Sequence, residues 1–170
     1  MITPEYAFTW ASQAATLGWV CLLAGVVAQG LAVRRPGAVR WARGSLWIGG
    51  RLLPVLLCVG YALALARWLG GADGGFGSLD QVARLFENRG LLLAGWVHYL
   101  AFDLWVGRWQ VDRLAQAVDA GGAGRPAWGL RLAAMPCLLM TFLFGPVGLL
   151  MFLLLLGGHT RMASALSRNA

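Results

Sequence analysis

The stretch that decides the fold is residues 96–107, which read WVHYLAFDLWVG. It lies inside an apolar run from Leu91 to Trp109, and about 20 such residues are enough to cross a bilayer as a helix. The run nevertheless contains a histidine, His98, and a carboxylate, Asp103. An ionisable side chain at this depth costs about 2.5–3.5 kcal/mol on insertion scales unless a partner or a cavity receives it. The sequence therefore predicts a membrane helix with a sheltered polar site.

Apolar stretches dominate the rest of the chain as well. Of its 170 residues, 59% are hydrophobic and 12% are charged, whereas about 25% charged residues are usual in soluble domains. We expect an all-α, polytopic membrane protein that forms a single domain over residues 1–170. Its four transmembrane helices are predicted at residues 8–33, 46–69, 90–109 and 130–157.

Three local signals refine this topology. Ser78 and Gln81 fit a capping box, and apolar residues then recur at helical spacing, so residues 78–88 are predicted to form a short amphipathic helix at the membrane interface before the third span. Pro54 is expected to kink the second span. Pro136 and Pro146 predict that the fourth span is bent or locally unwound, which is tolerated at depth only where backbone is buried or lines a cavity.

The charge pattern predicts an orientation. The net charge of +7 comes from arginine alone, since the chain has no lysine. Nine arginines fall in or beside the first and third loops and five elsewhere, which predicts that those loops are cytoplasmic and that both termini are periplasmic. The arginines are scattered over short loops, which argues against nucleic acid binding. We expect neither a cleavable signal nor a transit peptide, and the arginine-rich, lysine-free composition favours the bacterial inner membrane.

Depth comparisons predict which polar side chains meet. At about 1.5 Å per residue, Arg51 and Asp103 lie at the same depth below the cytoplasmic surface, with Gln29 in the same layer. Two opposite buried charges cost less together than apart, so we expect an Arg51–Asp103 ion pair. That pair could serve as a structural staple or as part of a reactive site.

A second predicted layer contains His98 and Tyr61, with the hydroxyl of Thr141 near mid-depth. His98 is offset from Asp103 by about 140° around the helix, so the two cannot form a direct dyad. His98 could be a core residue or a functional one. The chain has only two histidines and no metal-ligand motif, so no metal site is expected.

These residues carry a resemblance to a known family. Residues 96–107, the fourth-span motifs PCL at 136–138 and GPVGLL at 145–150, and Arg51, Pro54 and Tyr61 together resemble the abscisic-acid-deficient-four-like membrane proteins. The resemblance covers about residues 46–156. It implies a four-helix membrane protein acting on a carotenoid or related isoprenoid, as plant members do in neoxanthin synthesis.

The implied reaction is an isomerisation in which an epoxide opens and a neighbouring carbon loses a proton. It needs an acid and a base and no cofactor. On this resemblance His98 would be the base or proton shuttle and Asp103 the acid or the anion that holds Arg51. The ligand would be bound by the hydroxyl donors and aromatic residues of the spans: Tyr61, Tyr99, Thr141, Trp96, Phe102 and Trp105.

Other functions remain open at this stage. The protein could be a non-catalytic pigment- or lipid-binding subunit, in which the polar layer only fixes the helix register. A transporter would suit the broken fourth span but would be expected to show an internal repeat. The expected partners are membrane lipid and a hydrophobic isoprenoid, with a homo-oligomer or a larger membrane complex as further possibilities.

Overall fold

The computed structural model describes residues 3–122 and 127–168, with side chains described as far as Arg161. Its longest element is α5 (Arg89–Ala120), which carries the polar stretch. The side chain of Asn88 caps it by accepting hydrogen bonds from the backbone N–H groups of Gly90 and Leu91, at 2.9 and 3.3 Å. Its 32 residues form one uninterrupted helix, about 48 Å long. The amphipathic residues after the predicted third span therefore continue the same helix.

The first helix packs along this central one. α1 spans Pro4–Ala32, and the Thr3 hydroxyl at its N-terminus accepts a hydrogen bond from the backbone N–H of Tyr6. Gly107 of α5 lies against the ring of Trp19, which lets α1 and α5 approach closely. The two helices share a buried core with apolar residues of α3 and α6.

The second predicted span is a helix with a widened turn. It consists of α2 (Ala38–Trp47), a π-helical turn η1 (Ile48–Leu52), α3 (Leu53–Trp68) and a 3₁₀ turn η2 (Leu69–Gly71). The backbone N–H of Leu53 donates to the carbonyl of Ile48, five residues back. Pro54 lacks an N–H and its ring would clash with the carbonyl four residues earlier. The proline irregularity expected in this span therefore takes the form of a π turn just before it.

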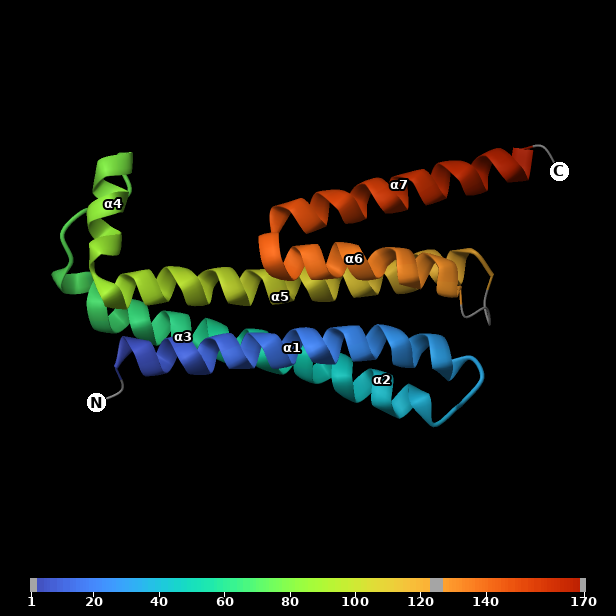
Figure 1. Cartoon of the computed structure of the whole chain (residues 1–170), viewed down its shortest axis with the longest axis horizontal. Coiled ribbons are helices and arrows are strands. Elements are labelled where there is room, and N and C mark those ends of the chain that lie inside the picture. Colours follow the sequence, from blue (N-terminus) through green and yellow to red (C-terminus); the bar gives the residue numbers. More distant parts are fainter. Residues whose placement is uncertain (1–2, 123–126, 169–170) are drawn as a thin grey trace.

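A short helix follows where the capping signal predicted one. α4 spans Leu79–Glu87, and the Ser78 hydroxyl accepts a hydrogen bond from the Gln81 backbone N–H at 3.3 Å. The Gln81 side chain accepts from the N–H of Gly77 rather than from that of Ser78. In Figure 1, α4 stands at one end of the bundle, across the direction of the long helices.

The prediction that the fourth span is a single bent helix is wrong. Two helices occupy it, α6 (Trp128–Phe144) and α7 (Pro146–Arg168), and the chain reverses between them at Gly145. Gly145 has a φ of 43°, in the left-handed region that glycine adopts without steric cost. Pro146 begins the next helix, where its fixed φ and missing N–H are tolerated. Hydropathy is continuous across this reversal, so the apolar pattern alone did not reveal it.

The hairpin changes the expected topology. Its apex lies near the middle of α5, and α7 runs back beside α6 (Figure 1). The start of α1 and the end of α7 therefore lie at opposite ends of the molecule, which corrects the expectation that both termini share one side. Within the part of the chain that the structure describes, three helical segments are long and apolar enough to cross a membrane: Pro4–Ala32, Ala38–Gly71 and Arg89–Ala120. The protein is thus an all-α molecule typical of integral membrane proteins, with a shorter apolar hairpin beside its three long helices.

Candidate functional site

The buried carboxylate Asp103 faces the apex of the α6–α7 hairpin. It is 8% exposed, and the Tyr99 hydroxyl, one helical turn away on α5, lies beside it. A Cβ placed on Gly145 would lie 2.8 Å from Asp103 Oδ1 and 3.3 Å from the Tyr99 hydroxyl oxygen. The other carboxylate oxygen, Oδ2, is buried without a hydrogen-bond partner among the described residues. The apex glycine therefore closes over a polar pair that has spare hydrogen-bonding capacity.

An apolar groove leads to this pair from the side of the bundle. We use the name apolar groove for a hollow of about 800 Å³ between α1, α4, α5 and the end of α6. Tyr99 and Leu143 line it toward the middle of α5, and Arg89 and Glu5, joined by a salt bridge at 3.1 Å, line it toward the start of α5. Its full lining is Pro4, Glu5, Phe8, Thr9, Phe86, Arg89, Leu92, Leu93, Gly95, Trp96, Tyr99 and Leu143.

Trp96 fixes one wall of the apolar groove. Its indole N–H donates a hydrogen bond to the Ser12 hydroxyl at 3.1 Å, and its ring lies 5.5 Å from that of Phe8. The Tyr99 ring stacks on it at a centroid distance of 6.1 Å. Because Trp96, Tyr99 and Asp103 follow one another on the same face of α5, the helix carries an aromatic wall that ends at the carboxylate.

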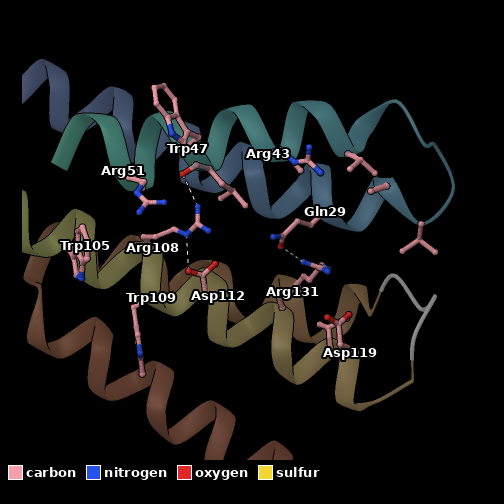
Figure 2. Close-up of a pocket in the computed structure, with 18 residues that line it drawn as sticks. Gln29, Arg43, Trp47, Arg51, Trp105, Arg108, Trp109, Asp112, Asp119 and Arg131 are labelled. Atoms are coloured by element: carbon pink, nitrogen blue, oxygen red, sulfur yellow. Dashed lines mark hydrogen bonds and ion pairs between the residues drawn. The ribbon is translucent and has the colours of Figure 1, made fainter. Parts of the chain in front are cut away.

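The expected Arg51–Asp103 ion pair is wrong. No such pair occurs among the described residues; Arg51 is exposed and lines a different groove, on the α2 side of the molecule (Figure 2). Helical rise fixes depth but not the direction in which a side chain points. Arg51 also lies within the π turn, which changes the rotation of the helix at that point.

His98 and Tyr61 meet, as their depths predicted. Their ring centroids are 5.2 Å apart, and the His98 ring lies 4.6 Å from that of Phe102. His98 is exposed and lines neither the apolar groove nor the groove of Figure 2. Successive helical residues point about 100° apart, so the side chain next to Tyr99 faces away from it. The structure does not bring His98 and Asp103 to one site.

The remaining predicted ligand-binding residues are dispersed. Phe102 and Trp105 are exposed on α5, and Trp105 lines the groove of Figure 2. Thr141 is fully buried, and its hydroxyl donates to the Cys137 carbonyl within α6 at 2.9 Å. A Cβ on Gly148 would clash with the Thr141 backbone, so Thr141 marks the tight contact between the two arms of the hairpin.

Sequence reasoning missed two residues where α5 meets the α6–α7 hairpin. Gly145 was interpreted as part of a bend, although a Gly-Pro pair also suits a reversal. Gln110 is fully buried, with its amide donating to the Gly148 carbonyl at 3.4 Å and its Oε1 unpartnered among the described residues. It lies seven residues after Asp103, on the same helix face, and that spacing could have identified it. Within the described residues no group of three or more His, Cys, Asp or Glu could hold a metal ion.

The family comparison covers most of this architecture. A family model described as ABA DEFICIENT 4-like matches residues 6–152, which include Asp103, the hairpin apex and all of the apolar groove except Pro4 and Glu5. No curated protein and no solved structure matches the chain. The chain therefore belongs to the ABA DEFICIENT 4-like family, which is associated with carotenoid-related function.

Proposed function

We propose that the protein binds a carotenoid or related isoprenoid in the apolar groove and isomerises it by acid–base chemistry, without a cofactor. The observation that carries the proposal is the Tyr99–Asp103 pair: Asp103 is buried, and the partly exposed Tyr99 beside it lines a groove with aromatic walls. An ionisable group at membrane depth, beside a hollow of this size, is a functional-site candidate.

The chemistry needs one proton to move in each direction. In the isomerisation implied by the family, the C–O bond of an epoxide breaks, its oxygen gains a proton, and a neighbouring carbon loses one. No electrons are exchanged with a second reactant. Tyr99 lines the groove. Its hydroxyl oxygen can take the proton that the carbon loses while its own proton passes to Asp103, and the return of that proton through Tyr99 to the epoxide oxygen restores both groups. Such catalysis contributes about 10²–10⁴-fold to a rate.

His98 takes no part in this version of the mechanism. Its exposed position on the α3 side of α5 separates it from the groove that Tyr99 lines. The role of base or proton shuttle expected for it from the family resemblance is here assigned to the Tyr99–Asp103 pair. With Phe102 and Tyr61 it forms an aromatic contact between α3 and α5.

The proposed orientation follows from the hairpin. The reversal places Arg161 at the end of the molecule where α6 begins, so the already arginine-rich end gains another arginine. The positive-inside rule then makes this end cytoplasmic in a bacterial inner membrane. The start of α1 is proposed to face the periplasm and the end of α7 the cytoplasm.

The competing function is a pigment- or lipid-binding subunit without catalysis. The stacked rings of Phe8, Trp96 and Tyr99 favour it, because an aromatic wall binds an apolar chain whether or not a proton moves. In that case the Tyr99–Asp103 pair would only fix the hairpin against α5.

Co-expression in a carotenoid-producing bacterium tests the proposal. Pigments extracted from cells with the wild type, with Asp103→Asn and with Asp73→Asn would be compared by chromatography. Asp73 is an exposed loop residue and controls for the charge change. We expect a new pigment isomer with the wild type and with Asp73→Asn, and its loss with Asp103→Asn. Undiminished conversion by a folded Asp103→Asn protein would refute the enzyme, whereas pigment that copurifies unchanged with all three would favour the binding subunit.

A further inference from the structure

A second groove lies toward the opposite end of the molecule and is rich in arginine. This arginine groove has a volume of about 990 Å³ and is enclosed by α1, α2, η1, α5 and α6 (Figure 2). Its charged lining consists of four arginines and two aspartates: Arg43, Arg51, Arg108, Arg131, Asp112 and Asp119. The formal charge of the lining is therefore +2, and no part of the proposed isomerisation uses it.

Two of the arginines are held in place by the protein. Arg108 donates through Nε to Asp112 at 2.9 Å and through a terminal nitrogen to the Leu46 carbonyl at 2.8 Å. Arg131 is 4% exposed and donates to the Gln29 side chain at 3.1 Å. These contacts join α5 to α2 and α6 to α1 across the groove, as the dashed lines of Figure 2 show. These hydrogen bonds of Arg108 and Arg131 hold the walls of the arginine groove together.

The other two arginines face the groove without such contacts. Arg43 and Arg51 are exposed, and neither forms an ion pair with any residue that the structure describes. One of the two aspartates, Asp112, is already bound to Arg108. Two guanidinium groups without an ion-pair partner among the described residues therefore line the arginine groove. Guanidinium groups of this kind bind the oxygens of an anion.

Tryptophan places this groove at the level of lipid headgroups. Trp47, Trp105 and Trp109 all line it, and tryptophan prefers the boundary between hydrocarbon and water. Trp47 is 53% and Trp105 57% exposed, so apolar surface borders the arginines on the outside of the bundle. A molecule that is anionic at one end and apolar at the other matches both parts of the lining.

We propose that the arginine groove is a binding site for the phosphate of an anionic phospholipid headgroup. Arg43 and Arg51 contact the phosphate oxygens, and the acyl chains leave past Trp105 into the bilayer. Basic hollows between transmembrane helices on the cytoplasmic side bind anionic headgroups in this way. The site is separate from the apolar groove, and the proposal does not depend on catalysis there.

Native mass spectrometry of the purified full-length protein tests the site. Dissociation constants for phosphatidylglycerol and phosphatidylcholine would be measured in a neutral detergent. At about 1 kcal/mol per arginine near an anionic lipid, the double variant Arg43→Gln with Arg51→Gln should bind phosphatidylglycerol about 30-fold more weakly. The matched control is Arg34→Gln with Arg35→Gln, which removes the same charge from exposed positions near the same end and outside the groove. It should bind as tightly as the wild type.

Three results would overturn the proposal. Equal losses in the two double variants would mean non-specific surface attraction, and equal affinity of the wild type for both lipids would mean no headgroup site. Inorganic diphosphate that binds without lipid and depends on Arg43 and Arg51 would point to a soluble phosphate compound instead. Should the double variant not fold, the wild-type lipid comparison and the single variant Arg43→Gln decide between the same outcomes.

Discussion

At the scale of single residues, the proposed chemistry depends on the hydroxyl of Tyr99. It lies beside Asp103, whose Oδ2 has no hydrogen-bond partner among the described residues. Replacing Tyr99 by Phe keeps the ring that stacks on Trp96 but removes the hydroxyl beside the carboxylate. We expect conversion of pigment to fall by about 10²–10⁴-fold, while bound ligand is retained. Chromatography of extracted and copurified pigments measures both, and Tyr6→Phe, at an exposed tyrosine, is the control.

The hairpin apex has no room for a side chain. At Gly145 an added Cβ would meet Asp103 Oδ1 at 2.8 Å, and the φ of 43° strains any other residue. Gly145→Ala should destabilise the protein by about 1–3 kcal/mol, measured as a lower midpoint of thermal unfolding in detergent. Gly157→Ala, in α7 with nothing within 4 Å, should be neutral or stabilising by up to about 1 kcal/mol. Equal midpoints for the two variants would contradict the placement of Gly145 against Asp103.

At the scale of helices, the π turn η1 packs closely against α1. A Cβ on Gly49 would clash with the Gly18 carbonyl oxygen and lie 2.9 Å from the Cys21 Cβ. Backbone cannot yield as a flexible side chain can, so Gly49→Ala should cost about 1–3 kcal/mol. Gly60→Ala, also in the second helical segment but with open space around it, is the control in the same unfolding measurement. A neutral Gly49→Ala would show that η1 and α1 do not pack as described.

At the scale of the whole molecule, the reversal at Gly145 predicts where the two ends of the chain lie. Three crossings and a hairpin put the start of α1 and the end of α7 on opposite sides, whereas four crossings would put them together. Reporter proteins fused to each end give the measurement: phosphatase activity marks the periplasm, and green fluorescence marks the cytoplasm. We expect phosphatase activity at the N-terminal fusion and fluorescence at the C-terminal one. Fusions that report the same side would exclude the hairpin topology.

Sequence reasoning succeeded where the position of a residue along its helix was sufficient. Apolar runs located the long helices, the Ser78 cap located α4, and depth alone brought Tyr61 to His98 at 5.2 Å. It failed where the direction of a side chain, or of the chain itself, had to be known. Arg51 has the depth expected for Asp103 but points into the arginine groove, and the single span over residues 130–157 became two helices because glycine and proline, not hydropathy, decide the reversal.

The same distinction applies to the candidate site. Trp96, Tyr99 and Asp103 share a helix face because of their spacing on α5, which is a local property of the sequence. The contact of Asp103 with Gly145 joins positions 42 residues apart, and nothing in the local pattern of either segment specifies it. The roles of the individual residues in catalysis stay predictions until the variants are measured.

The hairpin turns back halfway along α5, so of the described helices only the short α4 takes the place of a fourth long helix along the first half of α5. In a bilayer, acyl chains would complete that side of the apolar groove. A hydrophobic substrate could then enter the apolar groove laterally from the leaflet and leave by the same route, without contact with water. Detergent would replace this lipid wall with its own tails, so occupancy of the groove should depend on the surroundings in which the protein is kept.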